Sequence, residues 1–160
     1  MYLVYRSRIR SVREKAAIRQ QIAELKGQAL RAQMNPHFIF NSLNAIQELI
    51  VTENHDASYQ YLSKFSKLLR IVLNMSERNF SSLHTEIELC RLYLELESLR
   101  FKHSFYYRID TGKIDTEVTL FPTLLVQPFI ENAIWHGLMH KEGEKTLLVK
   151  FEERTASSVA

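Results

Sequence analysis

The chain has 160 residues, and its 21 Lys and Arg against 18 Asp and Glu give a formal net charge of +3. This length suits one domain of ordinary size or two small ones. The single cysteine excludes an internal disulfide and indicates a reducing compartment. No stretch has the roughly 20 apolar residues that span a bilayer. Scarce Gly and Pro favour long helices.

Basic residues crowd positions 6–19, directly after the apolar run Met-Tyr-Leu-Val-Tyr. This order is typical of the cytoplasmic end of a membrane helix under the positive-inside rule. A nucleic-acid-binding arm and a solvated helix face are the alternatives. We expect attachment to a membrane through a segment that precedes this sequence, and no direct contact with nucleic acid.

Residues 6–35 are predicted to form one helix. A narrow apolar seam with heptad-like spacing runs along it, formed by Ile18, Ile22, Leu25, Ala29 and Ala32. Such a seam favours pairing with the same helix of a second copy, so a homodimer is predicted. The alternative is that the seam packs on the rest of its own chain.

The helix is predicted to resume beyond Pro36 and to reach about Val51. Because Pro36 has no N–H to give to the carbonyl of Ala32, a kink is expected beside His37. Polar residues recur at helical spacing on one face: Gln33, His37, Asn41, Asn44 and Glu48. The alternative without a chemical role is that His37 is a core histidine whose ring is hydrogen-bonded by neighbouring side chains.

A second amphipathic helix is predicted over residues 57–76. Its apolar side carries Tyr61, Leu62, Phe65, Leu68, Leu69, Val72 and Leu73. The polar connector at 52–56 is short, so the two helices should form an antiparallel hairpin. Two such hairpins would form a dimeric four-helix bundle.

A third helix is predicted from the N-cap Ser82 to about Phe101. Glu95, Glu97 and Arg100 lie near its end, and we interpret them as ion pairs on the helix surface rather than as an acid–base cluster.

Alternating residues then predict strands within 104–121 and at 145–152, with a turn at 110–115 that contains Gly112. The change of period places a domain boundary at about residues 78–82.

The last helix is predicted to start after Pro122 and to stop at Gly137. Asn132 and His136 are four residues apart and share a face, with Glu131 beside them. On pattern alone these side chains are ordinary surface polarity.

Two segments resemble motifs of one family. Ala-Gln-Met-Asn-Pro-His-Phe-Ile-Phe-Asn-Ser-Leu-Asn is similar to the phospho-acceptor motif of sensor histidine kinases of the LytS/YehU type, and Gln-Pro-Phe-Ile-Glu-Asn-Ala-Ile-x-His-Gly resembles their asparagine box. The resemblance implies that His37 accepts a phosphoryl group from ATP and that Asn132 coordinates Mg²⁺. It also implies that Glu131 and His136 belong to the ATP site.

The resemblance further implies a mainly α chain with a small α/β part. Residues 1–80 would form a juxtamembrane helix and a dimerisation and histidine-phosphotransfer hairpin. Residues 81–160 would form the N-terminal half of an α/β-sandwich ATP-binding domain. The implied protein is a homodimeric sensor kinase at the cytoplasmic face of the bacterial plasma membrane. It would pass its phosphoryl group to a response regulator. A non-catalytic dimerisation or scaffold module and a module that only accepts phosphate are the alternatives.

Two departures from the family pattern matter. The Asp-x-Gly-x-Gly box and the glycine-rich lid are not in this sequence, so we expect the 160 residues alone to bind ATP weakly or not at all. Many histidine kinases place an acid directly after the histidine, where this chain has Phe38. Asn41 and Glu48 are the two candidates for a hydrogen bond to the His37 ring.

Overall fold

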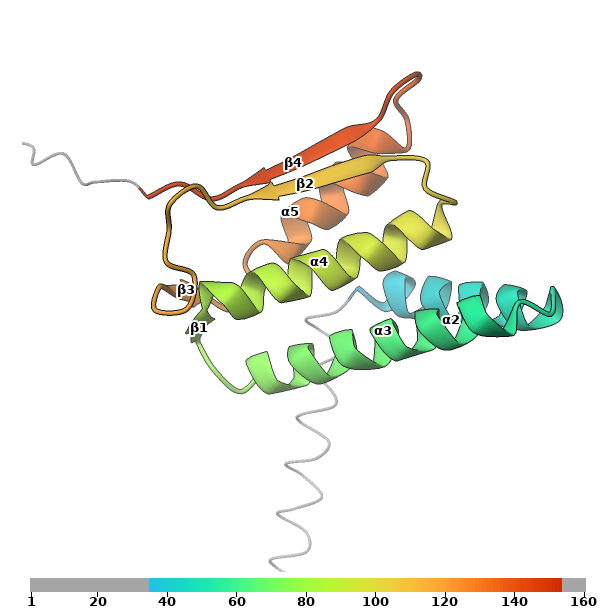
Figure 1. Cartoon of the computed structure of the whole chain (residues 1–160), viewed down its shortest axis with the longest axis horizontal. Helices are drawn as coiled ribbons and strands as arrows, with labels where there is room; N and C mark the ends of the chain where they lie inside the picture. The colour runs from blue at the N-terminus through green and yellow to red at the C-terminus, as the bar shows by residue number, and fades with distance from the viewer. Residues whose placement is uncertain (1–34, 154–160) are drawn as a thin grey trace, which may run out of the picture.

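The computed structural model describes residues 35–153 (Figure 1). The helices are α2 (Pro36–Val51), α3 (His55–Met75), α4 (Leu83–Arg100) and α5 (Gln127–Asn132), which continues as the π-helix η1 (Ala133–Leu138). The strands are β1 (Phe80–Ser82), β2 (Tyr106–Asp110), β3 (Leu120–Pro122) and β4 (Thr146–Lys150). This part of the chain is mainly helical with a small sheet component, as predicted. No helix within 35–153 is long and apolar enough to cross a membrane.

Helix α2 begins at Pro36, and Asn35 is its N-cap. Asn35 has a non-helical ψ of 115°, and its side chain accepts a hydrogen bond from the backbone N–H of His37. Pro36 stands in the first turn, where its missing N–H removes no helical bond. The predicted passage of a helix through Pro36 with a kink is therefore wrong. The predicted helix and seam at 6–34 lie outside the described residues.

Helices α2 and α3 form the predicted antiparallel hairpin (Figure 1). Asn54 caps α3 by accepting a hydrogen bond from the N–H of Ala57 at 3.3 Å. The buried side of α3 carries Tyr61, Phe65, Leu68, Val72 and Met75. The middle of the predicted apolar side is therefore buried, whereas Leu62 and Leu73 at its edges are exposed.

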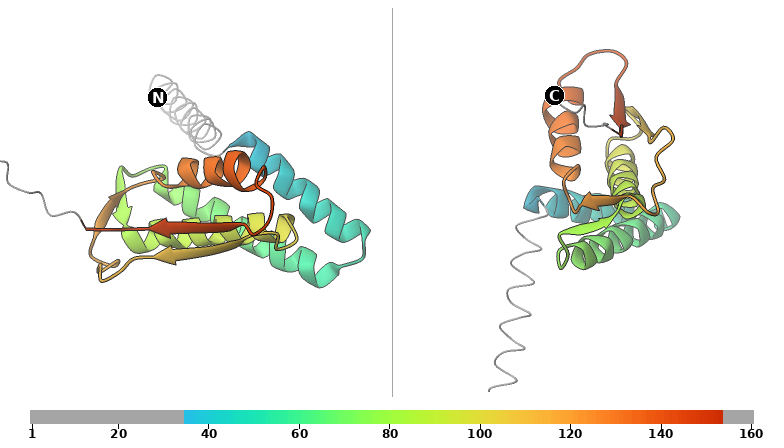
Figure 2. Two further views of the ribbon diagram at one scale, coloured as in Figure 1. Left: turned by 90° about the horizontal axis from the view of Figure 1, so that it is seen from above. Right: turned by 90° about the vertical axis from the view of Figure 1, so that its left-hand side faces the viewer.

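Helix α4 lies in the middle of the molecule. It begins after Ser82, whose hydroxyl accepts a hydrogen bond from the N–H of Thr85, as predicted for an N-cap. It packs against the hairpin on one side and is covered by α5 and strand β2 on the other (Figure 2). One hydrophobic core runs from Phe38 of the hairpin through Tyr93 of α4 to Ile134 of η1. This core crosses the predicted boundary near residue 80.

The strands form two separate pairs. β1 pairs antiparallel with β3, and β2 pairs parallel with β4, with Tyr106 opposite Thr146 and Asp110 opposite Lys150. β2, β3 and β4 lie within or beside the predicted strand segments. β1 was not predicted, because three residues are too few to show a period of two.

Helix α5 starts at Gln127 rather than after Pro122. The intervening loop is held by the carboxylate of Glu86, which accepts hydrogen bonds from the N–H groups of Leu124 (3.0 Å) and Val126 (3.1 Å). The helical segment ends at Leu138, one residue beyond the predicted stop, and Gly137 lies inside η1. A π-helix closes wider turns, as in the bond from the N–H of Met139 to the carbonyl of Ile134.

Candidate functional site

The two sequence motifs meet in one pocket. The start of α2 lies beside the end of α5 (Figure 2). The pocket between them has a volume of ≈ 270 Å³. Its lining consists of Asn35, His37, Glu131, Asn132, Trp135 and His136. The structure therefore brings together His37 and all three predicted nucleotide-binding residues, although His37 and Asn132 are 95 positions apart.

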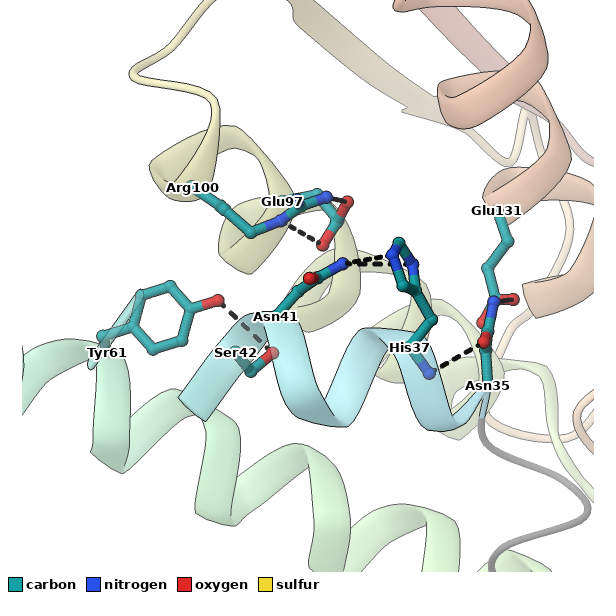
Figure 3. Close-up of polar contacts among 8 residues, drawn as sticks. All are labelled: Asn35, His37, Asn41, Ser42, Tyr61, Glu97, Arg100 and Glu131. Carbon is teal, nitrogen blue, oxygen red and sulfur yellow. Dashed lines mark hydrogen bonds and ion pairs between the residues drawn. The ribbon is translucent and has the colours of Figure 1, made fainter. Parts of the chain in front are cut away.

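Asn41 and Trp135 contact the ring of His37. The Asn41 amide nitrogen lies 3.1 Å from Nδ1 and 3.3 Å from Nε2 of the imidazole, one helical turn along α2 (Figure 3). The indole of Trp135 meets the imidazole edge to face, with 4.9 Å between ring centroids. Of the two candidate partners, Asn41 makes the contact, and Glu48 lines a different pocket between α2 and α3.

Glu97 and Arg100, near the end of α4, form a buried ion pair beside His37 and Asn41 (Figure 3). The Glu97 side chain is 0% exposed, and that of Arg100 is 14% exposed. The prediction of a surface pair is wrong because aromatic rings cover it: the guanidinium lies 4.0 Å from the ring centroid of Phe101 and 4.6 Å from that of Trp135.

The charges around Glu97 link it to the site. Burial raises the pKa of Glu97, the hydrogen bonds and charge of Arg100 lower it, the charge of Glu131 raises it and His37 lowers it. The two carboxylates, the guanidinium and the imidazole therefore belong to one electrostatic cluster.

Glu131 differs from the other predicted ligands because both of its oxygens are engaged. Gln127 donates from its Nε2 to Oε1 of Glu131 at 2.9 Å, and Asn35 donates from its Nδ2 to Oε2 at 3.4 Å. Asn132 and His136 are exposed. Within residues 35–153 the side chain of neither makes a hydrogen bond. The Asn132 amide oxygen is therefore free to take a ligand, and a neutral, hard oxygen is the kind of donor that Mg²⁺ accepts.

Comparison with known proteins identifies the family of this chain. The family model described as "Histidine kinase" matches residues 23–105 of the chain, which is more than half of it. The chain belongs to the histidine kinase family.

Its relatives are sensor kinases of the LytS type. The chain is 34% identical over 132 residues to the sensor histidine kinase YpdA of Escherichia coli, which is 82% of this chain and 22% of that protein. It is 32% identical to the sensor protein LytS of Oceanobacillus iheyensis, over 78% of this chain and 21% of that protein. It is 34% identical to the sensor histidine kinase/phosphatase LytS of Staphylococcus aureus strain Mu50, over 86% of this chain and 23% of that protein. The chain spans about a fifth of the length of these relatives.

Several residues in and beside this pocket were not predicted as site residues from the sequence. Asn35 carries a signal that could have found it, since Asn directly before Pro is typical of an N-cap followed by the first helical residue. Gln127 and Glu131 are four apart, a spacing that allows the observed bond. Nothing local indicates that Trp135 covers both Arg100 and His37.

Proposed function

We propose that this chain is the phosphotransfer hairpin and part of the ATP-binding domain of a sensor histidine kinase in a two-component system. ATP with Mg²⁺ phosphorylates His37, and the phosphoryl group then passes to an aspartate of a response regulator. The observation that carries this proposal is the shared pocket of His37, Asn132 and His136. A surface histidine with no chemical role has no reason to face the asparagine box.

In the proposed reaction an unprotonated imidazole nitrogen of His37 attacks the γ-phosphorus in line with the leaving oxygen. The P–N bond forms as the bond between the γ-phosphorus and the β,γ-bridging oxygen breaks, and ADP leaves with the electron pair. Asn132 would hold Mg²⁺, which neutralises charge on the phosphate oxygens. His136 lines the same pocket and would lie near the phosphates. Phosphoryl transfer needs mainly positioning and charge stabilisation, and the amide and imidazole groups that line this pocket would contribute to both.

Asn41 would orient the His37 ring by a hydrogen bond, which is the role of the acidic residue that follows the histidine in many other histidine kinases. For Nε2 to be the nucleophile, Nδ1 must carry the proton and donate it to an acceptor. The Asn41 amide lies 3.1 Å from Nδ1. An amide has a donor at one end and an acceptor at the other, so turning it over places Oδ1 against the Nδ1 proton and leaves the lone pair of Nε2 without a hydrogen-bond donor.

The proposed kinase is a homodimer held at the cytoplasmic face of the plasma membrane. Apolar side chains of the hairpin remain exposed in this chain: Phe40 by 66%, Leu43 by 48%, Leu62 by 47% and Leu73 by 40%. A second hairpin would cover them in a four-helix bundle. Membrane attachment rests on the basic segment at 6–19.

The first test is transfer of labelled phosphate in trans. The chain is mixed with Mg²⁺, labelled ATP and the catalytic domain of a complete relative, and the product is examined for acid-labile, base-stable phosphate. We expect label on the wild type and loss of all label in His37→Gln. His55→Gln is the matched control, because His55 is an exposed histidine at the start of α3 and should label normally.

Label that survives in His37→Gln would reject His37 as the acceptor. A folded wild-type chain that takes no label would favour the non-catalytic scaffold.

A further inference from the structure

We propose that Asn35 is a positioning residue that sets the first turn of α2 in register with the asparagine-box helix of the same chain, by bridging His37 and Glu131. The importance of this register for phosphoryl transfer rests on the proposed function, whereas the bridge itself does not.

The two ends of the Asn35 side chain act on different helices. Its Oδ1 accepts a hydrogen bond from the backbone N–H of His37 at 3.0 Å. Its Nδ2 donates to Oε2 of Glu131 at 3.4 Å, across 96 positions of sequence (Figure 3). Ser or Asp would cap α2 as well as Asn does, but the Asp carboxylate has no hydrogen to donate, and Ser has no second polar atom to reach Glu131 while its one oxygen caps His37. An amide is therefore required by the bridge and not by the cap.

The Glu131 end of the bridge is fixed in place. Gln127 is 2% exposed and donates to Oε1 of Glu131 at 2.9 Å, so the carboxylate is oriented from the buried side of α5. Its second oxygen then faces the start of α2. A hydrogen bond to a carboxylate is stronger than one between neutral groups, which makes this partly buried contact effective despite its length.

The bridge controls where the His37 ring lies. His37 follows Asn35 by two residues, and its imidazole meets Trp135, which follows Glu131 by four residues on the same helical segment. Holding Asn35 on Glu131 therefore holds the His37 ring on Trp135.

A polarity swap tests the bridge. In Asn35→Asp the cap survives, but a carboxylate faces Glu131, so the contact becomes repulsive. In Glu131→Gln the one remaining side-chain oxygen is held by the buried amide of Gln127, so the new N–H₂ faces the N–H₂ of Asn35 and no bond forms. In the double variant, one oxygen of the new aspartate caps His37 while the other accepts from the new glutamine. The bridge is then rebuilt with donor and acceptor exchanged.

The readout is the contact between His37 and Trp135, followed by nuclear Overhauser effects between the two rings and by tryptophan emission. Trp135 is the single tryptophan of the chain, so the emission reports on this site alone. The His37 ring is either in contact with Trp135 or away from it. We expect each single variant to lower the equilibrium constant for this contact by about tenfold, which is the effect of losing one hydrogen bond to a charged group. The double variant should return to the wild-type signal. Asn54→Asp makes the same change at the N-cap of α3, where no carboxylate is bridged, and should leave the signal unchanged.

Two results would overturn the proposal: single variants that keep the wild-type ring contact, or a double variant that fails to regain it. Circular dichroism on every variant separates loss of the bridge from loss of the fold. The ring contact requires no phosphoryl transfer. A chain that shows the predicted pattern of contacts but takes no label at His37 therefore contradicts the proposed function and leaves the bridge intact.

Discussion

At the scale of single residues, the surroundings of His37 depend on a buried charge pair. The Arg100 guanidinium makes hydrogen bonds to Glu97 and packs against the rings of Phe101 and Trp135. A planar cation stacks on aromatic faces in a way that a lysine ammonium does not. The same indole that covers Arg100 contacts the His37 ring, so this ion pair supports the wall of the pocket.

Replacing Arg100 by an uncharged residue should destabilise the fold. We expect Arg100→Met to lower the free energy of unfolding by about 3–5 kcal/mol, because Glu97 stays buried without a partner. The double variant Glu97→Leu, Arg100→Met should recover much of this loss, since two apolar groups leave no buried charge. Urea denaturation measures both.

The exposed pair Lys67–Glu88 is the control for that experiment. Lys67 is 58% exposed, so Lys67→Met should change the free energy of unfolding by about 1 kcal/mol or less. If Arg100→Met were no more destabilising than Lys67→Met, the ion pair would not be supporting the site.

At the scale of elements, Glu86 determines where α5 begins. Its carboxylate is 0% exposed in the first turn of α4, and it accepts from the N–H groups of Leu124 and Val126 in the loop before α5. A negative charge near a helix N-terminus is also favourable. Leu124 has φ +59°, so the loop takes a conformation that a leucine adopts only when other contacts hold it. The position of Asn132 follows from this anchor.

The buried carboxylate should make stability depend on pH. Burial raises the pKa of Glu86 above its ordinary value of 4.5, against the lowering effect of the Val126 and Leu124 hydrogen bonds. Because the folded pKa is the higher one, proton binding stabilises the fold at low pH, and this contribution is lost as the pH rises through the folded pKa. Glu86→Gln keeps one acceptor and has no proton to lose.

We therefore expect Glu86→Gln to be less stable than the wild type near pH 4, with a gap that narrows as the pH rises. Urea denaturation at a series of pH values for both proteins gives the difference. Parallel curves for the two proteins would show that Glu86 binds protons equally in the folded and unfolded states.

At the scale of the whole molecule, the hairpin of α2 and α3 has apolar side chains both on its buried side and on its exposed side. Its inner side contributes Phe38, Tyr61 and Phe65 to the common core. Its outer side leaves Phe40 and Leu62 exposed. Large exposed apolar side chains gathered on one element typically mark an interface when they form a patch.

A charge on the outer side should prevent pairing of two chains. We expect the wild type to sediment as a dimer at micromolar concentration and Phe40→Glu to weaken association by at least about tenfold, without loss of helix content. Val118→Glu is the matched control, because Val118 is 74% exposed but lies outside the hairpin. A wild type that stays monomeric, or a Phe40→Glu dimer as tight as the wild type, would contradict the four-helix bundle.

The sequence by itself determined the elements whose signals are local. Ser82 caps α4 as predicted, and the alternating residues around 106–110 and 146–150 form strands. Capping and periodicity act over a few residues, so they can be read from the chain directly. The two motifs also carried the kinase resemblance, which family membership confirms.

The tertiary structure alone decided what covers each side chain. Glu97 and Arg100 have the spacing of a surface pair, and only Phe101 and Trp135 make them a buried one. The strand β1, the parallel pairing of β2 with β4 and the meeting of Asn35 with Glu131 likewise depend on segments far apart in sequence. Periodicity shows which face of a helix is apolar, but the partner of that face is fixed by packing free energy summed over the whole core.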